Sequence, residues 1–142
     1  MPRAYTVATA ALALNVSPKW IDNTLSHFGV QGVTQARQGI ARKLSVESLI
    51  ILSIALTLIH DLDVPVGNAV DVGTQIIKAH GRFKLSLGVT LEIDLQHIEA
   101  VLLERLEHAV EMAPLPRRGR PPQKTTGVSI ETPRQIVPVK LV

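Results

Sequence analysis

A helix start placed directly after a helix end constrains this sequence more than any other feature. Residues 6–14 carry apolar side chains at helical spacing, and the next two residues break that pattern. Ser17-Pro18 then favours a new helix, because Ser caps the free amides of a first turn and Pro at the first helical position has no amide to leave unpaired. This helix is predicted to run to about Phe28. Two short helices joined by a tight turn form a helix-turn-helix candidate.

Beyond this pair, the sequence predicts a hairpin and two further helices. Residues 29–44 hold three glycines with several β-branched and basic residues, which is typical of a hairpin. Residues 45–62 predict a buried helix, since their apolar run is shorter than the roughly 20 residues of a membrane span. Pro65 is expected to open a fourth helix that reaches about Ala79.

The last patterned segment predicts a ribbon and an amphipathic helix. Residues 83–93 alternate apolar and more polar side chains around Gly88, as one or two strands would. Asp94 is expected to cap a helix that runs to about Ala113 with an apolar seam on one face. Such elements have little to pack on after a complete domain, so we expect a second copy to cover them. The predicted dimer interface consists of Leu95, Ile98, Leu102 and Leu106.

The charges are distributed unevenly along the chain. Residues 1–44 carry five basic side chains against one acidic, residues 45–113 carry four against ten, and residues 114–142 carry six against one. A polyanion would be met by the two basic ends while the acidic middle faces away, which is the arrangement expected of a nucleic-acid binder. Double-stranded DNA is therefore the expected partner.

Two groups of residues are candidates for contacting DNA. On the second helix, the exposed N-terminal turns would present Lys19, Trp20 and Asn23 to base edges. Burial of Trp20 in the core is the competing interpretation. In the hairpin, the residues expected on phosphates are Arg37, Arg42 and Lys43, with an ordinary solvated loop as the alternative.

Residues 16–19 (VSPK) open the second helix, the basic hairpin follows, and residues 44–49 (LSVESL) open the third helix. This order resembles the MerR-like winged helix-turn-helix family over roughly residues 5–79. The resemblance implies that the second helix docks in the major groove, that Ser17 joins the residues facing DNA, and that the hairpin acts as a wing on the flanking backbone. It also implies dimerisation through a C-terminal helix.

The chain departs from that family at residues 22–24, where many members carry Arg followed by two Tyr. Asp22 opposes phosphate binding; it could accept from a cytosine amino group, or hold Lys19 or a nearby basic side chain in place. The thiol ligands of metal-sensing members are absent, because the chain has no cysteine. Regulation by a small ligand is therefore not expected.

The composition changes after Ala113 to a segment rich in proline and basic residues, which is typical of a disordered tail. Its core, Arg117, Arg118, Gly119 and Arg120, resembles an AT-hook, in which an extended chain lies in a narrow A·T minor groove. A basic linker that only raises nonspecific affinity is the alternative. The short apolar pieces at residues 128–130 and 136–142 are a candidate docking peptide for another protein, with plain disorder as the alternative.

No chemical motif points to catalysis. The histidines show no H-x-x-x-H pair, and the chain holds no Gly-rich phosphate loop or nucleophile elbow, so no enzyme, metal or cofactor is expected. The predicted fold is mainly α, a winged helix-turn-helix with a short β-ribbon and a C-terminal dimerisation helix. The predicted parts are a DNA-binding domain at 1–80, a dimerisation segment at 81–113 and a tail at 114–142.

The sequence thus predicts a cytoplasmic, nucleoid-associated regulator of transcription that binds duplex DNA as a homodimer. The alternative is an architectural or accessory protein that uses the same elements without strong sequence preference.

Overall fold

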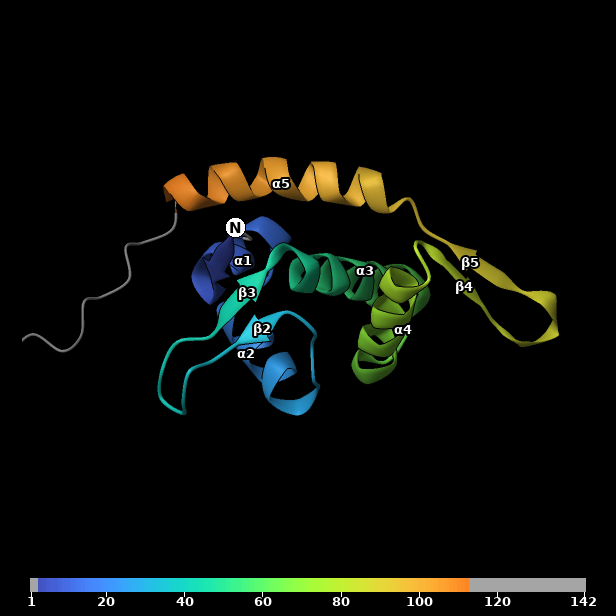
Figure 1. Cartoon of the computed structure of the whole chain (residues 1–142), viewed down its shortest axis with the longest axis horizontal. Coiled ribbons are helices and arrows are strands. Elements are labelled where there is room, and N and C mark those ends of the chain that lie inside the picture. The colour runs from blue at the N-terminus through green and yellow to red at the C-terminus, as the bar shows by residue number, and fades with distance from the viewer. Residues whose placement is uncertain (1–2, 113–142) are drawn as a thin grey trace, which may run out of the picture.

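The computed structural model describes residues 3–112, which are mainly helical with two small antiparallel sheets (Figure 1). The α-helices are α1 Val7–Leu14, α2 Pro18–His27, α3 Val46–Leu62, α4 Val66–Lys78 and α5 Leu95–Met112. The strands are β1 Ala4–Thr6, β2 Val33–Thr34, β3 Lys43–Ser45, β4 Arg82–Lys84 and β5 Thr90–Glu92, with a 3₁₀ turn, η1, at Ser86–Gly88. The predicted mainly α class is confirmed.

Polar side chains set the starts of four helices where the sequence predicts them or within one residue. The side-chain oxygens of Thr6, Ser17, Ser45 and Asp94 each accept a hydrogen bond from the amide three residues later, at 3.1–3.2 Å. Each such cap contributes about 1 kcal/mol to helix stability. Asp63 ends α3 in the left-handed conformation, with φ of 58°.

A three-stranded sheet lies beside the N-terminal helices, in the order β1-β3-β2. The predicted hairpin is present as β2 and β3, which pair antiparallel with Val33 opposite Leu44. No sequence pattern predicts β1, a three-residue strand that pairs with the other edge of β3 and places Tyr5 opposite Leu44. Both of these side chains are buried, so the sheet contributes directly to the core.

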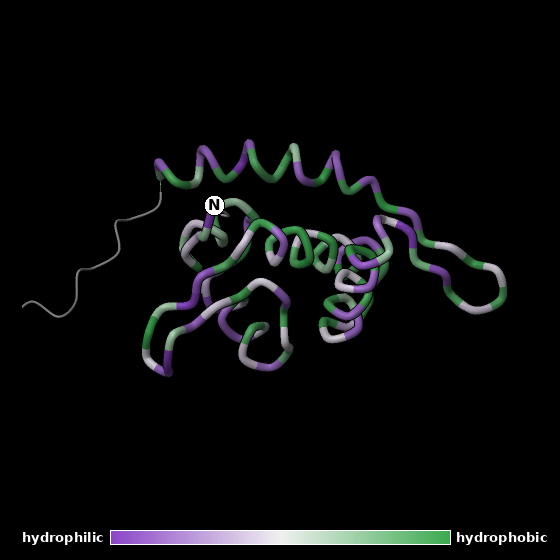
Figure 2. Tube along the Cα trace, in the orientation of Figure 1, coloured by the Kyte–Doolittle hydropathy of each residue, from purple (hydrophilic) through white to green (hydrophobic). Residues whose placement is uncertain are grey.

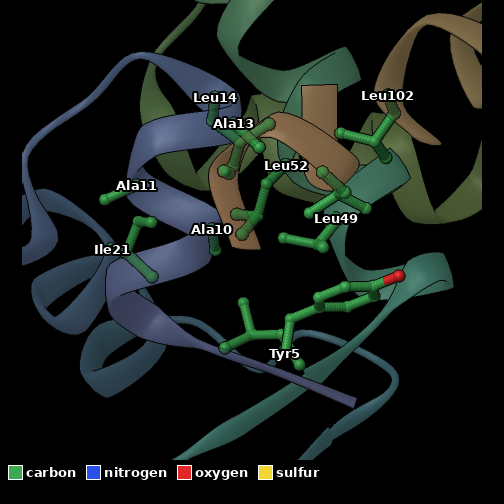
Figure 3. Packing of buried hydrophobic residues seen from close by; sticks show 12 residues of the cluster. Tyr5, Ala10, Ala11, Ala13, Leu14, Ile21, Leu49, Leu52 and Leu102 are labelled. Carbon is green, nitrogen blue, oxygen red and sulfur yellow. The ribbon is translucent and has the colours of Figure 1, made fainter. Parts of the chain in front are cut away.

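The helices and the sheet enclose two hydrophobic clusters. The first lies where α1, α2, α3 and α5 meet β1 and β3, and Figure 3 shows Tyr5, Ile21, Leu49 and Leu102 converging from these elements. The second lies between α3 and α4 and is extended by the ribbon and the start of α5. Because α3 supplies buried residues to both clusters, it is the central element of the fold.

Helix α5 packs on the chain's own core. Leu102 and Leu106 are 2% and 1% exposed and belong to the first cluster, while Leu95 and Ile98 pack against the second. Figure 2 shows the hydrophobic turns of α5 facing the helices beneath it. Leu102 and Leu106 are therefore not free to face a second copy as predicted, because α5 covers the outer side of α1 with these two side chains; dimerisation of the chain stays a prediction. The segment predicted for dimerisation completes the core of the same chain.

The predicted strand pair is a two-stranded ribbon, β4–β5, that projects from the body beyond α4 (Figure 1). Phe83 and Leu91, directly opposite each other, pack against the second cluster. Gly81 sits at the base with φ of 98°, and a Cβ there would lie 2.6 Å from the Ile93 carbonyl oxygen. Only glycine fits this close approach without strain.

Candidate nucleic-acid interface

A short turn at residues 15–17 joins α1 to α2. Asn15 adopts the left-handed conformation, with φ of 58° and ψ of 47°, which Asn tolerates better than most residues. The Val16 amide donates to the Ala11 carbonyl at 3.0 Å, which satisfies a carbonyl left free at the end of α1. The turn therefore orients α2 through local backbone bonds.

Helix α2 is buried on one face and open on the other. Ile21 and Thr24 are 0% and 4% exposed and hold the helix on the core. Lys19, Asp22 and Asn23 lie on the exposed part of the helix. The open face thus carries Lys19 and Asn23, the cationic and amide side chains predicted to contact DNA.

Two other predicted contact residues of this region have structural roles. Trp20 is partly buried and packs against the first hydrophobic cluster, which agrees with the alternative interpretation of its role. The Ser17 hydroxyl is engaged as the helix cap, accepting from the Trp20 amide at 3.1 Å, although the residue itself is exposed. Neither side chain is as free to meet a ligand as Lys19 or Asn23.

Arg42 connects the β2–β3 hairpin (residues 33–45) to α2. Its guanidinium donates to the Asp22 carboxylate and to the Asp22 carbonyl, each at 3.2 Å, and to the Ser26 hydroxyl at 2.9 Å. The Arg42 side chain is 22% exposed, whereas the Asp22 side chain is 54% exposed. We call these three hydrogen bonds the Arg42 clasp. The clasp matches the suggestion that Asp22 holds a nearby basic side chain.

The clasp changes the role expected of Arg42, which was contact with phosphate, because its guanidinium already donates to acceptors within the protein. Arg37 and Lys43 remain exposed along the hairpin. The connecting loop has hydrogen bonds of its own: the Gln35 side-chain amide donates to the Ile40 carbonyl at 2.7 Å, and the Ile40 amide donates to the Arg37 carbonyl at 3.1 Å. Arg37 thus lies on a loop with defined internal contacts, whereas Lys43 lies on β3.

Sequence reasoning missed Ser26, which completes the clasp. Asp22 and Ser26 are four residues apart and therefore share one face of α2. That spacing is the signal that points to a common partner. Nothing local identifies the partner as Arg42, which lies 20 residues from Asp22 and reaches it only through the hairpin.

The remaining predicted DNA-contact residues, Arg117, Arg118, Gly119 and Arg120, lie outside the described residues, as do both apolar pieces of the tail. Within residues 3–112, no group of three or more His, Cys, Asp or Glu side chains is placed to hold a metal ion. No helix in this range combines the length and apolar character needed to cross a membrane.

Comparisons with protein-family models, with curated proteins and with solved structures found no match to this chain.

Proposed function

We propose that the protein binds duplex DNA as a transcriptional regulator, through α2 and the β2–β3 hairpin acting as a winged helix-turn-helix. In this proposal, the exposed face of α2 enters the major groove and the hairpin lies along the flanking phosphates. The observation that carries the proposal is the Arg42 clasp, because it ties the basic hairpin to the open face of α2.

The charges near this surface support the proposal. Lys19 on α2 and Arg37 and Lys43 on the hairpin are exposed. The negative charge of the Asp22 carboxylate is partly offset by the Arg42 guanidinium at 3.2 Å, which weakens the repulsion that Asp22 would otherwise exert on phosphate. The exposed cations can therefore attract a polyanion with little electrostatic repulsion from α2.

Base selectivity is assigned to the side chains that extend from the open face of α2. Asn23 carries an amide that can pair with adenine in the major groove, and Lys19 can donate to guanine acceptors. Arg42 acts in this proposal as a residue that positions the hairpin against α2, because its guanidinium donates to Asp22 and Ser26.

The test is a selection of bound sites from a random duplex pool with the full chain, followed by affinity measurements at several salt concentrations. We expect Arg37→Ala to weaken binding and to reduce the salt slope by about one, as loss of one phosphate contact does. We expect Lys19→Ala to weaken binding to the sites that carry guanine at the position it contacts. We expect Asn23→Ala to relax selection at one position, with a change of about 1–3 kcal/mol in discrimination.

Lys78→Ala is the matched control, because Lys78 is an exposed cation on α4, outside the proposed surface. Its affinity and salt slope should equal those of the unmodified chain. Equal losses in Lys78→Ala and Lys19→Ala, or no duplex binding at low salt, would show that α2 is not the DNA-binding element.

A second candidate function is an architectural or accessory role, in which copies coat or bridge DNA without reading sequence. The β4–β5 ribbon favours it, because Leu87 at its tip is fully exposed and offers a contact between copies. Binding with a steep salt slope but no selected motif would support this second function over the first.

A further inference from the structure

A cleft lies between the end of α4 and β4, and we call it the α4–β4 cleft. It is at the base of the ribbon, which leaves the body beside the end of α4 (Figure 1). Its volume is about 430 Å³, within the roughly 300–1,000 Å³ of small-molecule sites. The lining consists of Gln75, Lys78, Ala79, Arg82, Phe83 and Lys84. The charged side chains of this lining are therefore all cationic.

The end of α4 determines where β4 begins. The Gly81 amide donates to the Ile76 carbonyl at 2.8 Å, and the His80 amide donates to the Ile77 carbonyl at 3.2 Å, which are the two bonds of a Schellman helix end. His80 and Gly81 have φ of 57° and 98°, so the chain reverses within two residues. Both walls of the cleft thus belong to one hydrogen-bonded turn.

This turn brings cations from two elements together. Arg82 and Lys84 are separated by one residue on β4, so their side chains leave the strand on the same side, about 7 Å apart at roughly 3.4 Å per residue. The residue between them, Phe83, packs against the second hydrophobic cluster and holds the strand on the body. Lys78 lies in the last turn of α4, and all three cations are exposed.

The positive charge of the cleft is only partly offset. Arg82 pairs with Glu92 on β5 at 3.2 Å, but both side chains are exposed, and such pairs are weak. Lys78 and Lys84 form no ion pair with another residue of 3–112. A lysine in the last turn of a helix is common because it interacts with the helix dipole, which accounts for Lys78 but not for the two cations on β4.

We propose that the α4–β4 cleft binds a small polyphosphate, the row of phosphates that a nucleotide carries or its inorganic equivalent. The ammonium of Lys and the forked guanidinium of Arg are the side chains that bind phosphate oxygens. The three cations exceed the single carboxylate by two, so an anion with several charges is favoured. A row of phosphates also spans the separation between Arg82 and Lys84 better than one phosphate does.

The proposal uses no residue of α2 or of the β2–β3 hairpin and is independent of DNA binding. The Gln75 side chain adds a neutral amide that can donate to a phosphate oxygen.

The test measures binding of inorganic triphosphate to the full chain by calorimetry, at fixed ionic strength and without divalent cations. We expect one triphosphate per chain, and inorganic phosphate should bind at least about tenfold more weakly because it makes fewer contacts. Lys78→Gln and Lys84→Gln each remove one charge-assisted hydrogen bond, so each should weaken triphosphate binding about tenfold with the circular dichroism unchanged.

Two matched controls separate the cleft from the net charge of the chain. Arg105→Gln removes an exposed cation that lies on α5 and does not line the cleft, so triphosphate affinity should stay the same. Glu92→Gln should act in the opposite direction, raising the affinity about threefold, because it removes the carboxylate that competes for Arg82. Glu111→Gln makes the same charge change at the end of α5 and should have no effect.

ATP in place of triphosphate identifies the source of the phosphates. Binding as tight as that of triphosphate, or tighter, supports a free nucleotide as the ligand, whereas weaker binding of ATP supports an inorganic polyphosphate.

Three results would overturn the proposal. Triphosphate could fail to bind saturably to the unmodified chain. Arg105→Gln could weaken binding as much as Lys78→Gln does, which would indicate attraction to net charge alone. Lys84→Gln could lower the affinity for duplex DNA and leave that for triphosphate unchanged, which would assign the cleft to the DNA backbone.

Discussion

Replacing Leu106 with Ala tests whether α5 belongs to the core of its own chain. Leu106 is 1% exposed and packs in the first hydrophobic cluster. The substitution removes three buried carbons, a transfer loss of about 2 kcal/mol, and leaves a cavity that α1 and α3 cannot fully close. We expect the free energy of unfolding to fall by about 3 kcal/mol, a large share of the stability of an ordinary domain.

The measurement is urea unfolding followed by circular dichroism and by the fluorescence of Trp20. Trp20 is the only tryptophan of the chain and packs against the same cluster as Leu106, so its emission reports the core directly. With a slope of about 2 kcal/mol per molar urea, the midpoint should move by about 1.5 M. Leu103→Ala on the same helix is the control; Leu103 is 40% exposed, and its loss should stay below about 1 kcal/mol.

Equal losses for Leu106→Ala and Leu103→Ala would refute the packing of α5 on α1. A Leu106→Ala loss that appears only at concentrations where copies associate would also refute it, because the seam would then be covered by a second copy. A loss that does not change with protein concentration places the seam inside one chain.

Three further predictions address single features of the fold. Gly81→Ala should lower the free energy of unfolding by more than about 2 kcal/mol, since its Cβ would lie 2.6 Å from the Ile93 carbonyl oxygen, whereas Gly88→Ala, with a φ of 75° and open space, should lose about 1 kcal/mol in the same urea assay. Ser45→Ala should lose about 1 kcal/mol in thermal or urea unfolding through its missing cap of α3, and no measurable loss would show that the hydroxyl bond to the Ser48 amide does not stabilise the helix. Arg42→Lys keeps the charge but loses the forked contacts to Asp22 and Ser26, so duplex affinity should fall about fivefold and trypsin should cleave faster after Arg37; an unchanged affinity would mean that Arg42 acts through its charge alone.

Helix starts could be predicted from the sequence because their chemistry is local. Ser17, Ser45 and Asp94 each bond to an amide three residues away, so a short window contains the whole interaction. The exposed face of α2 follows from the same local periodicity once Ile21 is placed inside. These features required no knowledge of the rest of the chain.

The features that could not be predicted depend on contacts between distant segments. An amphipathic pattern in α5 shows that one face is buried but does not say what covers it. The side chains of α1 indicate what covers α5. Ala10, Ala11 and Ala13 point in different directions around the helix and are all buried, so α1 packs against neighbours on more than one side. The pairing of β1 with β3 depends likewise on residues far apart in the sequence.

The packing of α1 beneath α5 also sets an order of events during synthesis. Helices α1 and α2 leave the ribosome early, but their core stays open until Leu102 and Leu106 have been added. Closing a contact of such long sequence separation carries a large entropic cost and slows folding. We therefore expect chains that terminate within the ribbon or earlier to remain unfolded and to be cleared by proteases. An incomplete copy would then leave no stable fragment to compete with the intact protein.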